Sequence, residues 1–410
     1  MNIREIEGGV TAPKGFLACG LRAGIKAGKT NRDMAMLYSE KPAAVAGTFT
    51  LNAVKAAPVR WDKKLVETRE QAQAVVINTG IANACTGDEG YANTKRMAKE
   101  TGKLLGIMPE AVLVCSTGVI GKQLDMDIIS KGIAAFSGEL KGTKEAGSQA
   151  AEAILTTDTH KKEIAVEFEI GGKTITMGGM CKGSGMIHPN MGTMLGFVTT
   201  DLSISRDLLV KALKNNIKDT FNMVSVDGDT STNDTVLLLA NGMAENDMLT
   251  EENEDYAVFC EALNIVNTYL AKQIAGDGEG ATRLIETVVV NAQDKEQAAV
   301  LAKSITTSNL TKAAVFGRDA NWGRILCAMG YSGVQFDPDK VDITISSEKG
   351  TVKLVENGLA TDYDEAFATE VLSPEQVNIL ADVKMGEATA TAWGCDLTYD
   401  YVKINADYRS

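Results

Sequence analysis

Hydrophobic positions along the chain follow two different periods, one typical of strands and one typical of helices. Residues 74–77 and 112–115 are short, continuous apolar runs, which predict buried strands. In residues 91–105 apolar side chains recur every three or four positions, and this spacing predicts a helix. The inward face of that helix is expected to carry Ala92, Met97, Ala98, Leu104 and Leu105. Further helices are predicted at 205–213 and 256–274, and further strands at 194–200, 284–290, 341–346 and 388–393.

A strand pair with a tight turn is predicted between residues 163 and 177. Apolar and polar residues alternate on both sides of Gly171-Gly172, and two glycines between such runs favour a two-residue hairpin turn. Helices and strands alternate along the rest of the chain, so we predict an α/β fold (α+β type, with mixed sheets) arranged in layers. A chain of 410 residues exceeds the usual size of one hydrophobic core, which predicts two lobes.

The composition is that of an ordinary globular protein, with 44% hydrophobic and 23% charged residues. A net charge of −13 argues against a nucleic-acid partner, because phosphate contacts need clustered lysines and arginines. The polar N-terminus does not resemble a secretory signal and no apolar run is long enough for a membrane span, so we expect a cytoplasmic protein without a membrane partner. Seven dispersed cysteines without a C-x-x-C pair are expected to be reduced and mostly buried.

Two further features limit the chemistry. The only histidines are His160 and His188, which argues against most zinc sites and most histidine-based catalytic triads. The acidic run 227–234 fails the EF-hand template, because Thr232 stands at the position that needs glycine and Leu238 at the position that needs glutamate. We therefore expect no metal and no tightly bound cofactor, and we interpret 227–234 as a hydrogen-bonded loop near the functional site.

The segment with the most distinctive chemistry is 180–195. Three glycines and a proline follow Lys182, which indicates a constrained loop, and the loop leads into a β-prone run at Thr193. A threonine hydroxyl needs an adjacent base to act as a nucleophile. If the bond between Gly192 and Thr193 were cut, the new α-amino group, with a reference pKa of ~7.7–8.0, would supply that base. The alternative is a glycine-rich loop that packs beneath a sheet and has no catalytic role.

Residues 182–195, Lys-Gly-Ser-Gly-Met-Ile-His-Pro-Asn-Met-Gly-Thr-Met-Leu, resemble the self-cleavage signature of the ornithine acetyltransferase (glutamate N-acetyltransferase) family of arginine biosynthesis. The chain departs from that family at Gly192, where alanine is usual before the cut, and at Ile81, where a second asparagine is common, so a polar role at position 81 is in doubt. Further blocks resemble the family in the same order and extend the match to nearly the whole chain: 23–26, 46–50, 54–59, 78–87, 116–121, 156–159, 225–234, 277–282, 317–324 and 401–409.

The resemblance implies an enzyme that activates itself by autocatalytic cleavage. Thr193 would attack the carbonyl of Gly192, which as a glycine should tolerate the strained turn, and would leave an α chain 1–192 and a β chain 193–410. The implied fold is a two-lobed layered sandwich with its cleft at Thr193, and the implied assembly is an α2β2 heterotetramer. Thr193 would then carry acetyl from N2-acetylornithine to glutamate in a ping-pong cycle. The resemblance leaves open whether acetyl-CoA is a second acetyl donor.

The resemblance also implies roles for individual residues. Thr117 and Gly118 match the oxyanion-hole pair, and the block that holds them follows a predicted strand. Lys182 is expected to bind a substrate carboxylate and Glu279 an ammonium group, although solvated loop charges explain both equally well without the family. The substrate-binding positions match Thr156 (with Thr157 as the alternative), Lys182, Thr193, Glu279, Asn405 and Ser410.

Two other functions are compatible with the sequence. The first is an N-terminal-nucleophile amidase or aminopeptidase, in which water accepts the acyl group in place of glutamate. The second is a non-catalytic binding protein with an inert cut site. Release of ornithine without glutamate would favour the hydrolase, and a single uncut chain on a denaturing gel would favour the binding protein.

Overall fold

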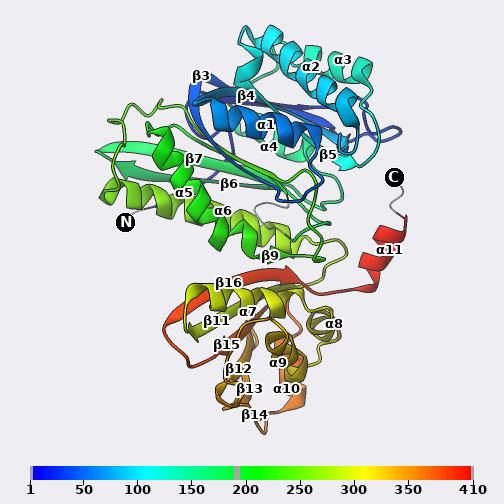
Figure 1. Cartoon of the computed structure of the whole chain (residues 1–410), viewed down its shortest axis with the longest axis vertical. Helices are drawn as coiled ribbons and strands as arrows, with labels where there is room; N and C mark the ends of the chain where they lie inside the picture. Colours follow the sequence, from blue (N-terminus) through cyan, green and yellow to red (C-terminus); the bar gives the residue numbers. More distant parts are fainter. Residues whose placement is uncertain (1–2, 189–193, 408–410) are drawn as a thin grey trace.

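The computed structural model of the chain describes residues 3–188 and 194–407, and it divides into two lobes (Figure 1). In the upper lobe, nine of the described strands form one mixed sheet in the order β1-β6-β7-β8-β10-β3-β4-β5, with β2 paired to β3. The strands of this sheet are β1 (Arg4–Ile6), β2 (Phe16–Leu21), β3 (Met34–Phe49), β4 (Gln71–Ile81), β5 (Val112–Val119), β6 (Lys162–Ile170), β7 (Lys173–Lys182), β8 (Leu195–Thr200) and β10 (Thr235–Ala240).

Two hydrophobic cores lie against the upper sheet. One core packs α5 and α6 on the sheet, and the other packs α1 to α4 on it. These helices are α1 (Ala57–Thr68), α2 (Gly87–Leu105), α3 (Met126–Ala135), α4 (Lys144–Ala153), α5 (Arg206–Asp219) and α6 (Glu254–Gly276), and short 3-10 helices lie at Pro109–Ala111 and Phe221–Met223. The first core continues into the lower lobe, because α6 also packs on strands of the second sheet.

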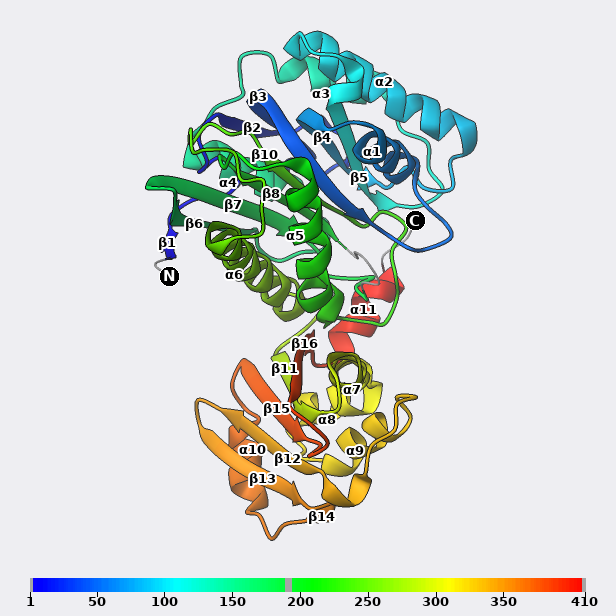
Figure 2. The same ribbon diagram turned by 60° about the vertical axis from the view of Figure 1, so that its left-hand side comes forward.

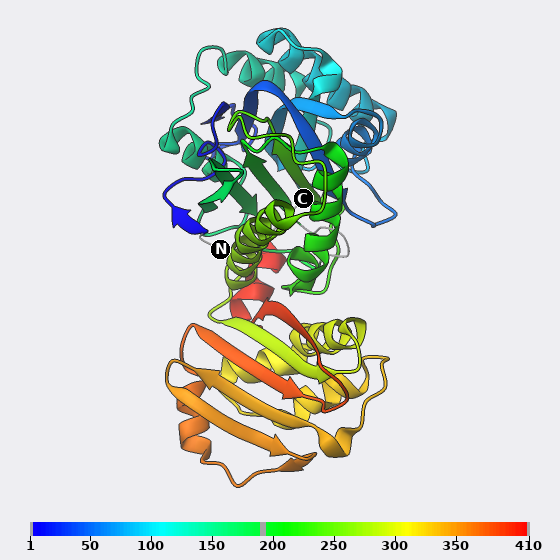
Figure 3. The same cartoon turned by 90° about the vertical axis from the view of Figure 1, so that its left-hand side faces the viewer.

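The lower lobe holds the second sheet, in the order β14-β13-β12-β15-β11-β16-β9, which Figure 3 shows spread across the lobe. Its strands are β9 (Val224–Ser225), β11 (Leu284–Ala292), β12 (Asp342–Ser347), β13 (Gly350–Glu356), β14 (Leu359–Ala360), β15 (Gln376–Asp382) and β16 (Ala388–Cys395). Its helices are α7 (Lys295–Thr307), α8 (Asn309–Gly317), α9 (Trp322–Gly330) and α10 (Glu365–Val371), with a 3-10 helix at Pro338–Lys340. After β16 the chain runs back towards the upper lobe in α11 (Tyr399–Asp407) (Figure 2).

The predicted mixed α/β fold and the predicted elements are confirmed. The hairpin turn between β6 and β7 places Gly171 and Gly172 at φ of +56° and +73°, a conformation that glycine adopts without strain. One part of the expected helix face is wrong: Ala92 is exposed, whereas Thr94 is fully buried. Thr94 is buried because Asn83 Nδ2 donates a hydrogen bond to its hydroxyl at 3.0 Å, so a polar pair occupies the inward position.

The cysteines are only partly as expected. All seven are free thiols, and Cys19, Cys115, Cys181 and Cys395 are buried, but Cys85 and Cys327 are exposed. None of the helices formed by residues 3–188 and 194–407 is long and apolar enough to cross a membrane.

The two lobes are a different division of the chain from the two fragments expected after cleavage. β7 and β8, which flank the expected cut, are antiparallel neighbours in the upper sheet, and Lys182 pairs with Leu195. β8 in turn pairs in parallel with β10. Residues from both expected fragments therefore form a single sheet.

Candidate active site

A cavity of about 150 Å³ opens in the upper lobe where several strands of its sheet end. Met194, the residue after the expected nucleophile, lines this cavity and is buried. Six residues with expected roles also line it, and they come from segments that are far apart in the sequence: Thr117, Gly118, Thr156, Lys182, Glu279 and Asn405. Thr157 lines the cavity as well, so the choice between Thr156 and Thr157 stays open.

The expected oxyanion pair lies at the end of β5. In the parallel register of β4 and β5, Gly80 pairs with Gly118, and the register shifts directly after this pair. Gly118 has a φ of +131°, and a Cβ atom there would lie 2.3 Å from the backbone carbon of Gly80. Only glycine, which has no Cβ atom, allows β4 and β5 to approach so closely in this conformation. The close contact between Gly80 and Gly118 at the ends of β4 and β5 therefore determines the backbone conformation at Thr117 and Gly118.

Asn233 connects these strand ends to the loop that the sequence analysis placed near the site. Its Nδ2 donates to the carbonyl of Ala82 at 2.6 Å and to the carbonyl of Ser116 at 2.7 Å, and the side chain is buried. Ser116 directly precedes the expected oxyanion pair, and Ala82 directly follows the end of β4. Ile81 contributes through its backbone, since its carbonyl accepts a hydrogen bond from Asn78 Nδ2 at 2.9 Å. A polar side chain is not needed at position 81 for this contact.

Lys182 ends β7 and brings a positive charge to the cavity. The residue is only 6% exposed, and its Nζ lies 3.8 Å from Asp158 Oδ2. Within the described part of the chain, its Nζ donates no hydrogen bond to a protein group. Because an ammonium group has three donors, Lys182 has free capacity for an anionic group in the cavity.

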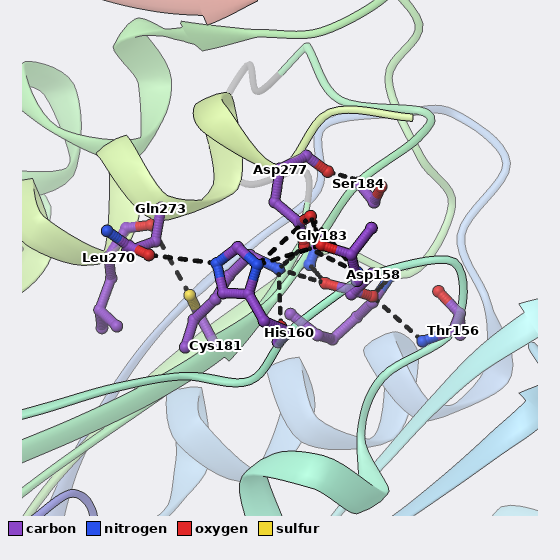
Figure 4. A network of polar contacts seen from close by, with 12 residues as sticks. Thr156, Asp158, His160, Cys181, Gly183, Ser184, Leu270, Gln273 and Asp277 are labelled. Carbon is purple, nitrogen blue, oxygen red and sulfur yellow. Dashed lines mark hydrogen bonds and ion pairs between the residues drawn. The ribbon is translucent and has the colours of Figure 1, made fainter. Parts of the chain in front are cut away.

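Asp158 belongs to a buried group of charged residues, and Figure 4 shows the network of polar contacts around Asp158 and Asp277. Lys162 Nζ lies 2.8 Å from Asp158 Oδ1 and 2.5 Å from Asp277 Oδ2, and its side chain has no exposed surface. Burial opposes the charge of Lys162, but attraction to the two aspartates outweighs it and raises the pKa of the ammonium group. Burial likewise opposes the charge of Asp158, but Lys182 and Lys162 outweigh it and lower the pKa of that carboxyl well below its ordinary value.

Glu279 supplies a negative charge on another wall of the cavity. Asn405 in α11 donates from Nδ2 to Glu279 Oε2 at 2.7 Å, so the C-terminal helix reaches the site. The backbone N–H of Glu279 donates to the carbonyl of Ser184 at 2.9 Å. A Cβ atom at Gly185 would lie 2.3 Å from the carboxyl carbon of Glu279. Any larger residue at position 185 would therefore displace the Glu279 carboxylate from its present position.

The loop 227–234 is a hydrogen-bonded loop beside the site, as expected. Asp227 accepts hydrogen bonds from the backbone N–H groups of Met186 and Ile187 at 2.6 and 2.9 Å. Ser231, Thr232, Asn233 and Asp234 line the cavity. Among residues 3–188 and 194–407 no cluster of three or more His, Cys, Asp or Glu side chains could hold a metal ion.

His188 makes the stability of the site dependent on pH. Burial, with a smaller contribution from Lys303, lowers the pKa of His188 to about 4, and its Nδ1 lies 3.1 Å from Ser225 Oγ. The unfolded chain protonates this histidine near its ordinary pKa of about 6.5, whereas the folded chain does not until about pH 4. Stability is therefore lost as pH falls from about 6.5 to about 4.

Replacement of His188 by glutamine should remove this part of the acid sensitivity. Because the side chain is half-buried, we expect an effect of about 2 kcal/mol across the window, less than the full pKa difference corresponds to. Urea unfolding of wild type and His188→Gln from pH 7.5 to 4 measures it. The carboxylates titrate in both proteins and cancel in the difference. A difference in unfolding free energy that does not vary with pH would contradict the assignment.

Some expected site residues cannot be placed and some residues of the site were not expected. Gly192, Thr193 and Ser410 lie outside the described residues. Asp158, Lys162 and Asp277 form the buried group of charges, and Asn233 holds the strand ends, but no role was expected for any of them. Asp158, Asn233 and Asp277 do stand inside blocks that resemble the family, which is a weak indication. Lys162 stands at the start of an ordinary alternating strand, where nothing distinguishes it.

The chain resembles known proteins over nearly its whole length. The ArgJ family model matches residues 17–410. The chain is 53% identical over 405 residues to the arginine biosynthesis bifunctional protein ArgJ of Caldanaerobacter subterraneus subsp. tengcongensis, covering 99% of each, and 53% identical over 395 residues to ArgJ 1 of Clostridium acetobutylicum, covering 96% of each. It is similar to the crystal structure of ArgJ from Bacillus halodurans with a TM-score of 0.51 and 48% identity, over 53% of this chain and 100% of that chain.

Proposed function

Because this chain belongs to the ArgJ family, we propose that it transfers the acetyl group of N2-acetylornithine to glutamate and releases ornithine and N-acetylglutamate. The observation that carries the proposal is the convergence of Thr117, Gly118, Lys182 and Glu279 on one cavity. These residues are distant in the sequence, and the family resemblance assigns all of them to one site. Met194 lines the same cavity, so the residue that follows Thr193 is at the site.

In the proposed activation, the Thr193 hydroxyl attacks the Gly192 carbonyl and the peptide bond becomes an ester. Water then hydrolyses the ester, which leaves the carboxylate of Gly192 and a Thr193 with a free α-amino group. The match to the solved Bacillus halodurans chain covers all of that chain but only 53% of this one. Residues 193–410 likewise make up just over half of this chain. This agreement in length supports the proposed α chain 1–192 and β chain 193–410, which we expect to assemble as α2β2.

In the proposed transfer, the α-amino group of Thr193 takes the hydroxyl proton while the hydroxyl oxygen attacks the acetyl carbonyl of acetylornithine. Backbone donors at Thr117 and Gly118 stabilise the negative charge on the acetyl oxygen. Ornithine leaves with the proton, and the acetyl group stays on Thr193 as an ester. The α-amino group of glutamate then attacks that ester and restores the hydroxyl. Exclusion of water from the cavity protects the ester from hydrolysis.

The charges of the cavity fit amino-acid substrates. Lys182 has free donors for the α-carboxylate, which acetylornithine and glutamate share, and Glu279 can accept from an ammonium group. The side chains of the two substrates end in opposite charges, so one site that binds both must rely on the group they have in common. Acceptors without an α-carboxylate should therefore be poor substitutes for glutamate.

Incubation with acetylornithine, with and without glutamate, tests the proposal. We expect ornithine to appear only with glutamate and in equal amount to N-acetylglutamate, measured by mass spectrometry. Ornithine release that does not need glutamate would identify a hydrolase, and a folded but uncut protein that releases no ornithine would identify a binding protein. The relatives are named bifunctional, so a parallel arm supplies acetyl-CoA in place of acetylornithine and tests the second donor.

A further inference from the structure

Lys162 carries a buried charge and has no role in the reaction proposed above. It is the first residue of β6, its side chain has no exposed surface, and it does not line the cavity. A buried ammonium group is costly unless ion pairs and hydrogen bonds compensate it. Here Asp158 and Asp277 both compensate it, and each of these aspartates also touches a segment that carries a substrate-binding residue.

Asp158 connects Lys162 to Lys182. The Oδ1 atom of Asp158 faces Lys162 Nζ at 2.8 Å and accepts the Gly183 N–H at 2.6 Å, whereas Oδ2 accepts the Thr156 N–H at 3.1 Å. Lys182 Nζ lies 3.8 Å from Oδ2. The carboxylate is thus paired with Lys162, which it shares with Asp277, and hydrogen-bonded on both oxygens. It attracts Lys182 to the floor of the cavity but does not take up its donors.

Asp277 connects Lys162 to Glu279 across the expected fragment boundary. Its carboxylate faces Lys162 Nζ at 2.5 Å and accepts hydrogen bonds from the N–H and hydroxyl of Thr159. Its carbonyl accepts from Ser184 Oγ at 2.7 Å, and the Ser184 carbonyl accepts the N–H of Glu279 at 2.9 Å. These contacts hold the loop that carries Glu279 next to the strand end that carries Lys182.

We propose that Lys162 is a positioning residue: by pairing with both Asp158 and Asp277 it offsets one of their two negative charges and so weakens their attraction for the Lys182 ammonium, which stays available to the substrate carboxylate. Through Asp277 it also holds Glu279 at a set place relative to Lys182. The inference rests on the proposed function and names a residue through which its binding groups act. Without Lys162, the buried Asp158 carboxylate keeps Lys182, 3.8 Å away, as its ion-pair partner, and Lys182 then pairs with it in place of the substrate.

The first experiment compares Lys162→Met with the control Lys161→Met. Lys161 is the adjacent lysine, but its side chain is 48% exposed and pairs with Glu163 on the surface. For Lys162→Met we expect the KM for acetylornithine at saturating glutamate to rise about tenfold or more, with kcat within about threefold, because substrate binding is lost and the nucleophile is unchanged. Lys161→Met should have wild-type values. A folded, cleaved Lys162→Met with wild-type KM would overturn the proposal.

A double-mutant cycle separates positioning from a general structural effect. If Lys162 acts through Lys182, Lys162→Met should lower kcat/KM by less than about twofold when Lys182→Met is already present. Equal losses in the two backgrounds would overturn the proposal. Should Lys162→Met not fold, Lys162→Gln, which keeps a hydrogen-bond donor beside the two carboxylates but removes the charge, takes its place with the same expectations. Wild type that does not transfer acetyl would refute the proposed function, whereas an additive cycle in an active enzyme refutes only the role of Lys162.

Discussion

Replacement of Thr193 by alanine is expected to leave the chain uncut and to reduce acetyl transfer at least a thousandfold. Alanine lacks the hydroxyl that attacks the Gly192 carbonyl, so the bond stays intact and no α-amino group forms at residue 193. The same hydroxyl is the proposed acetyl carrier, so both steps are lost by one change. Removal of a nucleophile that acts together with its base typically costs more than a thousandfold in rate, because the two groups act as a unit.

Intact mass spectrometry and N-terminal sequencing check this prediction. Wild type should give two masses, and its second N-terminal sequence should begin Thr-Met-Leu-Gly; Thr193→Ala should give one uncut chain. Thr193→Ser is the matched control, since it keeps a hydroxyl and a free amine and should still cut and transfer at a reduced rate. Active wild type that shows only the original N-terminus would contradict the mechanism of both steps.

The elements of the fold were predictable because their determinants are local. The period of apolar residues defined strands such as 112–115 and helices such as 256–274, and two adjacent glycines defined the β6–β7 turn. The exposed Ala92 shows the limit of this reasoning. Its inward neighbour Thr94 is buried through a hydrogen bond to Asn83, and a partner eleven residues away does not appear in a hydrophobic period.

The candidate site was predictable only where its residues stand in distinctive blocks. Lys182 and Glu279 each stand beside glycines, a context that indicates a loop close to a ligand, and the family resemblance assigned roles to both. Lys162 has no such context: its importance comes from Asp158 and Asp277, and Asp277 is brought to it by the packing of α6 on the sheet. Buried ion pairs between distant segments are properties of tertiary structure, which one sequence without its fold does not reveal.

The expected cut between Gly192 and Thr193 stays a prediction, and the sequence did not indicate how it relates to the fold. The sequence indicated two lobes and two fragments, and these are different divisions of the chain. β7 and β8 stay paired on either side of residues 189–193, so the ladder between them can hold both fragments together after cleavage. Residues on both sides of the expected cut, among them Lys182 and Glu279, therefore line one cavity.

Replacement of Gly118 by alanine is expected to lower kcat by about a hundredfold or more, with a much smaller change in KM. The new Cβ would lie 2.3 Å from the backbone carbon of Gly80, and a backbone neighbour cannot move aside as a flexible side chain can. The φ of +131° adds strain. The end of β5 must shift, and this displaces the proposed oxyanion donors, whose loss typically costs a hundredfold to a thousandfold in kcat.

Gly121→Ala is the control that separates displacement of the donors from backbone strain. Gly121 lies three residues further along, its φ is +84°, and an added Cβ would meet nothing within 4 Å. It therefore carries the strain of a positive φ without the contact with Gly80. We expect Gly121→Ala to lose some thermal stability through this strain but to keep kcat within about threefold of wild type. If both variants lost the same activity, general strain would explain the effect. If Gly118→Ala kept full activity in a cleaved protein, the oxyanion donors would have to lie elsewhere.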